Sequence, residues 1–306
     1  MNMKKLLSSR NGASFVIFAL SLVVLLSSVS LVTDVGMMTF HRAKLSNAVD
    51  AAALAGAQEL IYHTGNAANT VNKYIQKNGY STAQVDISFE DDNTSIRVNA
   101  SYDVQFTFAR LMGFDSGNVS VTAKGKVLPI VGLKGGVRPF AIEDQELHYG
   151  DEYILKEGGG DGTTGNYDGI SLGGSGAKVY YNNIVEGYDG RLMIGDYITT
   201  EPGNMSGSTE SGIDELIDQC THVPKCTYDH FVPDCPRIIY IVVVDTLDVS
   251  GRSSVQINGF ASFFLEGVAG SGTESEVTGR FIKTVTAGEM AESQNDYGLY
   301  GVKLTK

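Results

Sequence analysis

Basic residues are scarce in this chain of 306 residues, which has 23 Lys and Arg against 35 Asp and Glu. The formal net charge of -12 argues against binding to nucleic acid and mainly indicates a soluble, acidic surface. Tryptophan is absent and only 6 residues are proline, whereas glycine (36) and tyrosine (15) are plentiful. This balance is typical of a turn-rich β domain rather than of a helical bundle or a disordered stalk.

Two further absences characterise the N-terminal region. Residues 11–33 contain no charged side chain, and this is about the length that a helix needs to cross a bilayer core of about 30 Å at about 1.5 Å per residue. No proline precedes Pro129, and a helical pattern continues past Asp34 into the alanine-rich residues 51–57. We therefore expect one continuous helix over about residues 13–62.

The charges that flank the apolar run predict its orientation. Lys4, Lys5 and Arg10 precede the run and Asp34 is the first charge after it, so the positive-inside rule places the N-terminus in the cytoplasm and nearly all of the chain outside. A cleaved signal peptide is the competing interpretation. We favour a retained anchor in contact with membrane lipid, because the run is longer than a usual signal core and residues 28–33 offer no convincing cleavage site.

The helix combines an apolar span, an exit Asp-x-Gly, a basic residue some turns later and an Asp followed by an alanine cluster. In this combination it resembles the N-terminal segment of TadE/TadG-like proteins of Tad (Flp) pilus assembly. Type IV prepilins carry a Glu five residues after their cleavage glycine, whereas that position counted from Gly12 is Ile17, which argues against processing into a pilin subunit. The residues that carry the resemblance are 12–20, Asp34, Gly36, Arg42 and 45–57.

The resemblance implies a membrane-anchored structural or assembly component of a Tad/Flp-type pilus or a related surface apparatus. Its partners would be other pilus-assembly or pilin-like membrane proteins, which it would contact through the N-terminal helix. The alternative is a membrane-anchored, adhesin-like binding protein of the cell surface, which would use the loops at about residues 158–176 and 200–207.

One face of the helix beyond the membrane carries apolar and small residues at a spacing of three and four. Small residues permit the close approach of another helix, so a partner helix could dock on this face. The sequence leaves equally open that the face packs against the protein's own outer region. The predicted partner-interface residues are Asp34, Arg42, Asp50, Ala52 and Gly56.

Beyond the helix, the periodicity of apolar residues changes from helical to alternating. A short helix is expected at about residues 67–77, followed by strands at about 85–89, 96–108 and 119–128. Residues 237–245 form the strongest strand pattern, apolar on both faces, and are expected to lie centrally in a C-terminal sheet.

These patterns predict an α+β protein in which an N-terminal transmembrane helix continues into a long helical stalk and is followed by a β-rich extracytoplasmic region. A domain boundary is expected where two glycines and a proline interrupt both periodicities, at residues 133–139. The expected parts are a cytoplasmic N-terminus (1–12), the transmembrane helix (13–33), the stalk (34–64), a small α/β module (65–132) and the β-rich domain (133–306).

Candidate metal ligands occur in two places. The glycine-rich stretch at residues 157–169 places Asp161, Asn166 and Asp168 close together, but their spacing does not match the calcium-binding EF-hand loop. We therefore interpret this stretch as a flexible loop.

The chain has only three cysteines, Cys220, Cys226 and Cys235, with His222 and His230 between them. For cysteines on the outer side of a membrane, one disulfide with a thiol left over is the first expectation. Unpaired or redox-labile thiols are the second. Zinc bound by Cys and His is the third, although the spacings match no standard ligand pair. We expect a disulfide among these cysteines and neither a resident metal nor a cofactor.

Signatures of catalysis are missing. A nucleophile elbow would require glycine at residue 177, where the chain has alanine. Cys226 and the nearby histidines are too close in sequence to supply nucleophile and base to one site, and neither a P-loop nor an HExxH motif occurs. We expect the protein not to be an enzyme.

Overall fold

The computed structural model describes residues 10–156, 169–203, 205–269, 276–292 and 294–305. The first nine residues and the glycine-rich loop with Asp161, Asn166 and Asp168 lie outside the described residues, so the predictions made for them stay predictions.

The chain divides into two compact units, each of which is described by itself. Unit 1 comprises Met1–Glu59, Gly65–Gly125 and Leu304–Lys306, and unit 2 comprises Leu60–Thr64 and Lys126–Lys303.

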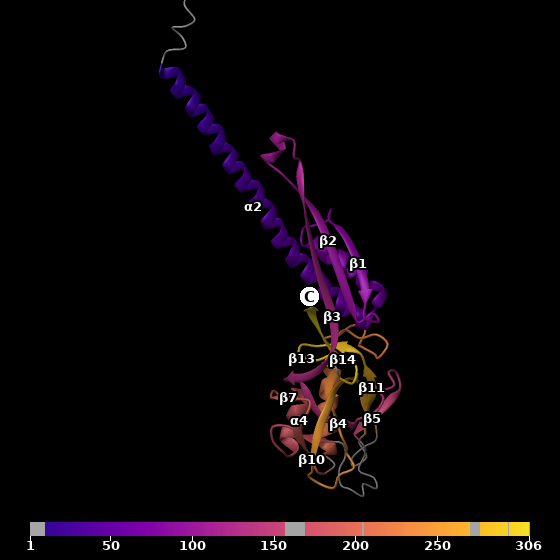
Figure 1. The fold of residues 1–306 in the computed structure, drawn as a ribbon. Helices are drawn as coiled ribbons and strands as arrows, with labels where there is room; N and C mark the ends of the chain where they lie inside the picture. Colours follow the sequence, from indigo (N-terminus) through magenta and orange to yellow (C-terminus); the bar gives the residue numbers. More distant parts are fainter. Residues whose placement is uncertain (1–9, 157–168, 204, 270–275, 293, 306) are drawn as a thin grey trace, which may run out of the picture. The chain divides into compact units, whose positions relative to one another are not determined.

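The N-terminal part of the chain forms α2 (Arg10–Tyr62), one helix of 53 residues (Figure 1). The absence of proline leaves its hydrogen-bond ladder intact. Hydroxyl groups in the apolar half are satisfied within the helix: Ser21 and Thr33, for example, each donate a hydrogen bond to the carbonyl oxygen four residues earlier. The predicted continuous helix is confirmed.

Unit 1 adds α3 and an antiparallel hairpin to the second half of α2. α3 ends as the sequence predicts, because Gly79 takes a left-handed conformation (φ 91°) and its amide caps the carbonyl of Gln76. In the hairpin, Val85 pairs with Ala100 and Glu90 with Ser95. The elements are α3 (Ala67–Lys77), β1 (Gln84–Glu90), β2 (Ser95–Gln105), η2 (Ala109–Met112) and the first part of β3 (Ser116–Lys134), with strand order β1-β2-β3.

Unit 2 is built on a sheet in which β9 lies between β4 and β10. β9 pairs with β4 in parallel and with β10 antiparallel, and all of its residues except Tyr240 are buried. The prediction of a central strand is therefore confirmed. The strands of this sheet, in spatial order, are β4 (Val137–Glu143), β9 (Ile238–Val244), β10 (Ser254–Ala269), β11 (Glu276–Ile282) and β5 (Glu152–Lys156).

Short strands complete unit 2. One group attaches to β10 and another to β3. The first group is β6 (Ile170–Ser171) and β8 (Tyr197–Thr200); the second is β7 (Arg191–Met193), β13 (Glu289–Met290) and β14 (Leu299–Thr305), with β12 (Thr284–Val285) beside β14.

Two helices, α4 (Ala177–Val185) and α5 (Ser206–Asp218), pack together in unit 2. A Cβ at Gly212 of α5 would lie 2.7 Å from Cγ2 of Ile184 in α4, so only glycine allows this close approach. Both helices contribute to a core with Phe140, Phe263 and Phe281. The helical spacing of Ile213, Leu216 and Ile217 predicts the second half of α5, whereas no pattern in the sequence predicts α4.

The limits of the two units differ from the predicted domain limits. β3 runs without a break through Gly125, where the units divide, and Pro129. The expected boundary at residues 133–139 is instead the turn between β3 and β4, where Gly135 and Gly136 have φ of 86° and 82°. Within the expected stalk, Leu45, Val49 and Ala53 are fully buried in unit 1, whereas most of residues 35–44 are exposed.

Candidate functional site

The first half of α2 leaves its large apolar side chains uncovered by the rest of the described chain. Phe15 is 80% exposed and Val32 is 73% exposed, and the large apolar side chains between them are 45–67% exposed. By length and composition, α2 is the one helix among the described residues that could cross a membrane. Apolar surface of this extent needs a lipid or protein environment to cover it.

Asp34 ends the exposed run and is itself only 4% exposed. Its carboxylate accepts main-chain hydrogen bonds from Thr107 (2.8 Å), Phe108 (3.1 Å) and Ala109 (2.6 Å), where η2 begins. Burial opposes ionisation, but the three amide donors prevail and lower the pKa of Asp34. Asp34 thus connects α2 to the β2–β3 connection of unit 1, and its side chain is already engaged within the chain.

The small residues of α2 are covered by unit 1. Ala52 is fully buried, and a Cβ at Gly56 would lie 2.6 Å from Cγ2 of Val71 in α3 and 3.0 Å from Cδ1 of Ile96 in β2. Of the two alternatives that the sequence leaves open, the structure describes packing against the protein's own outer region. These two residues have no surface left for a partner helix, and Asp50 is half-buried.

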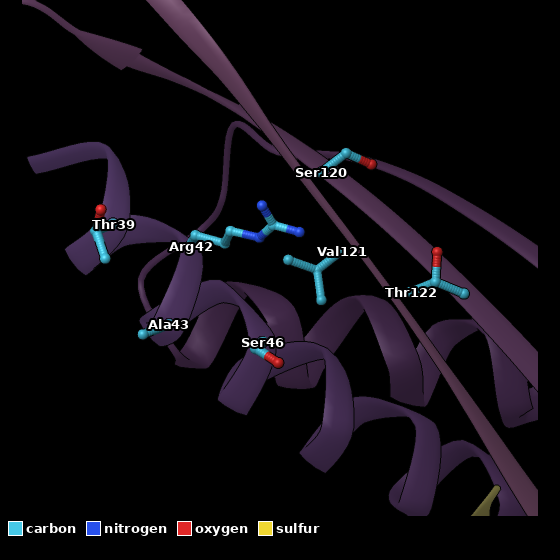
Figure 2. Close-up of a pocket in the computed structure, with 7 residues that line it drawn as sticks. All are labelled: Thr39, Arg42, Ala43, Ser46, Ser120, Val121 and Thr122. Atoms are coloured by element: carbon cyan, nitrogen blue, oxygen red, sulfur yellow. The ribbon is translucent and has the colours of Figure 1, made fainter. Parts of the chain in front are cut away.

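Arg42 lies about four helical turns before Gly56, on nearly the same side of α2 but in a stretch where the helix is exposed, and it lines a groove of ≈ 580 Å³ beside β3. Figure 2 shows its guanidinium extending from the helix towards Val121 of β3. Among the described residues, no ion pair or hydrogen bond engages this guanidinium. The groove therefore offers an unpaired positive charge beside a short apolar side chain, and its other lining residues are Thr39, Ala43, Ser46, Ser120 and Thr122.

The three cysteines and His222 converge in unit 2. Cys220 Sγ lies 3.6 Å from Cys235 Sγ and 3.6 Å from His222 Nδ1, and Cys226 Sγ lies 3.5 Å from the same nitrogen. All three cysteines are free thiols and buried, whereas His230 is exposed and outside the cluster.

The thiols of this cluster differ in acidity. Burial opposes ionisation of Cys220, but hydrogen bonds from the amide of Cys226 and from His222 lower the pKa of its thiol to about 6. Burial raises the pKa of Cys235 to about 12. Within the cluster, the thiol of Cys220 is therefore more acidic than that of Cys235.

Comparison with known proteins bears on α2. Residues 12–59 match the family described as "Putative Flp pilus-assembly TadE/G-like". This stretch is therefore similar to that family, and it is called the TadE/G-like segment below. No curated protein and no solved structure matches the chain.

The TadE/G-like segment lies entirely within α2 and ends where α2 leaves unit 1. It contains both halves of the helix, the exposed apolar half and the half packed in unit 1. The resemblance predicted from the sequence is confirmed. The match indicates a pilus-associated role, and the one apolar helix found among the described residues is consistent with a single membrane span.

The predicted site residues thus fall into three groups. Asp34, Ala52 and Gly56 hold unit 1 together, Arg42 faces an open groove, and the cysteines gather with His222. Sequence reasoning missed the segment at residues 107–109 that binds Asp34, because it lies more than 70 residues away. From their interleaving with the cysteines, it named both His222 and His230 as candidate metal ligands, but it could not tell that only His222 joins the cluster.

Proposed function

We propose that the protein is a membrane-anchored structural or assembly component of a Tad/Flp-type pilus or a related surface apparatus. In this proposal the first half of α2 crosses the membrane with the N-terminus in the cytoplasm, and the rest of units 1 and 2, from Asp34 on, is extracytoplasmic. The observation that carries the proposal is the two-part character of the TadE/G-like segment. Its first half is exposed and apolar, and its second half is the core of a folded unit.

The exposed stretch of α2 around Arg42 is the surface that we assign to partners. Arg42 follows Thr33 by nine residues, which places it about 13 Å further along the helix axis. The headgroup layer on one side of a bilayer is about 5–8 Å deep. The backbone of Arg42 therefore lies beyond the headgroup layer, and this position favours a carboxylate-bearing partner protein, such as another pilus-assembly or pilin-like membrane protein, over a lipid phosphate.

We propose a structural rather than a catalytic role. The groove beside Arg42 is lined by hydroxyl groups, but no histidine, aspartate or glutamate that could act as a base is among its lining residues. The adhesin-like alternative depends largely on a loop that lies outside the described residues, and no observation in the described part of the chain favours it.

The test is affinity purification of the tagged, full-length protein from solubilised membranes, with mass spectrometry of the copurifying proteins and of its own N-terminus. Arg42→Glu is compared with Lys73→Glu, which makes the same charge change at an exposed position of α3. We expect pilus-assembly components to copurify with the wild-type chain and with Lys73→Glu, and to be lost or strongly reduced with Arg42→Glu.

An intact N-terminus at Met1 or Asn2 is expected for an assembly factor. An N-terminus that begins after Gly12 would instead identify a pilin-like subunit. Absence of pilus-assembly components from the wild-type sample would contradict the proposal and favour an independent surface-binding protein.

A further inference from the structure

We propose that Cys220, His222, Cys226 and Cys235 form a structural Zn²⁺ site in unit 2. These four side chains each offer one ligand atom, and the four atoms lie within 4.8 Å of one another. Three thiolates and one imidazole are an established ligand set for tetrahedral structural zinc. The inference is independent of the proposed role in a pilus, because it concerns the fold of unit 2 alone.

Three of the six distances between the ligand atoms match the edges of such a tetrahedron, and the other three are within 4.8 Å. With Zn–S bonds of about 2.3 Å and Zn–N bonds of about 2.0–2.1 Å, the S···S edge is about 3.8 Å and the S···N edge about 3.6 Å. The observed Cys220–Cys235 distance is 3.6 Å, and the distances from His222 Nδ1 to Cys220 and Cys226 are 3.6 and 3.5 Å. A metal ion could enter with little movement of the protein.

A disulfide would engage only two of these four side chains. The bond would bring two sulfurs to about 2.05 Å and leave the third cysteine, also buried, without a partner. It would also give no role to the imidazole nitrogen that faces two of the sulfurs. Four protein ligands around one point, by contrast, engage all of these groups and leave no open position, which is characteristic of structural rather than catalytic zinc.

The ligands lie in a connection of unit 2 that has no helix or strand of its own to hold it in place. Residues 219–237 connect α5 to β9 and contain no helix or strand. Long connections without secondary structure are uncommon inside compact domains. Cys220 stands at the end of α5 and Cys235 shortly before β9, so a shared metal would hold both ends and the middle of the connection together.

The cluster is packed against other buried side chains of unit 2 and is bordered by one arginine. The cysteines pack beneath Ile238, Phe264 and Ile282. Arg237 donates a 2.7 Å hydrogen bond to the carbonyl oxygen of Cys226, and its guanidinium lies 4.7 Å from the centre of the Phe264 ring. Zinc with three thiolates and a neutral imidazole carries one net negative charge, and this fixed guanidinium is placed to balance it.

The experiment measures metal and thiols on the same purified, full-length protein. Elemental analysis gives zinc per chain, and thiol titration in denaturant with a chelator and without a reductant counts reduced cysteines. We expect about one zinc per chain and all three cysteines as thiols. After exchange with Co²⁺ the protein should show the visible absorption bands of a tetrahedral, thiolate-ligated ion. Two thiols missing from the count, with no bound metal, would overturn the site in favour of a disulfide.

Two histidine variants provide the matched comparison. His222→Ala removes a ligand, whereas His230→Ala removes an exposed histidine from the same connection. We expect His222→Ala to weaken zinc binding at least about tenfold in competition with a chelator, and His230→Ala to leave it unchanged. Equal zinc retention by the two variants would overturn the assignment. If His222→Ala fails to fold, the metal and thiol counts on the wild-type chain still distinguish a zinc site from a disulfide.

Discussion

Gly56 allows the packing of α2 within unit 1 to be tested sharply. A Cβ at this position would lie 2.6 Å from Val71 Cγ2 and 3.0 Å from Ile96 Cδ1, whereas non-bonded carbons rest at about 3.5–4.0 Å. Overpacking costs about 1–3 kcal/mol, and Gly56→Leu falls at the upper end because four carbons must be placed against a stiff valine. Better helix propensity offsets about 1 kcal/mol of this. The expected net loss in the stability of unit 1 is about 2 kcal/mol.

Gly36→Leu is the control on the same helix. No atom lies within 4 Å of a Cβ built at Gly36, so this variant gains helix propensity without a clash. Hydrogen exchange of the full-length protein, followed on peptides of α3 and β2, measures the local stability. A loss of 2 kcal/mol corresponds to exchange about 30-fold faster in Gly56→Leu. Unchanged exchange together with lost partner binding would refute this reasoning and restore Gly56 to a partner interface.

Further predictions concern charge. The pKa of Asp34 is lowered and that of Glu90 is lowered to about 2 by hydrogen bonds from Arg97 and Lys124, from ordinary values of 3.8 and 4.5. The stability that these carboxylates give to unit 1 is therefore present above the ordinary values and lost as the pH falls through the lowered ones. Unit 1 should therefore lose stability as the pH is lowered through these values, which hydrogen exchange of its peptides measures. Asp34→Asn should weaken this dependence on pH, and an identical acid response of the variant would argue against the role of Asp34. Arg138 in β4 has its Nε and Nη1 buried without a hydrogen-bond partner among the described residues, and burial lowers its pKa to about 10. Arg138→Met should stabilise unit 2 by about 1–3 kcal/mol in thermal unfolding; a lower unfolding midpoint would show that the guanidinium is satisfied.

The parts of the fold that follow from local patterns could be predicted. The 53-residue helix, the hairpin of β1 and β2, and the central position of β9 all rest on long or strongly periodic stretches. The end of α3 follows from a single glycine with a left-handed backbone. In each case the deciding information lies within a few residues in sequence.

What could not be predicted depends on contacts between distant residues. The apolar spacing on α2 suits a partner helix and the chain's own α3 equally, and only the fold selects α3. Asp34 is bound by amides more than 70 residues away. The unit boundary falls inside β3, because a strand can continue through Gly125 and Pro129 when both sides find partners. α4 is bounded by glycines that indicate loops when seen without the core they pack on.

The central claim is that the exposed stretch of α2 around Arg42 contacts other membrane proteins of a pilus-type apparatus. Site-specific photocrosslinking in living cells tests it most directly, with the crosslinker placed at the exposed positions Phe40 or Ala43 of α2 and at Lys73 of α3 as a control. The account predicts adducts with pilus-assembly membrane proteins from Phe40 and Ala43, and none from Lys73. Absence of such adducts from both α2 positions, in cells that assemble the apparatus, would contradict it.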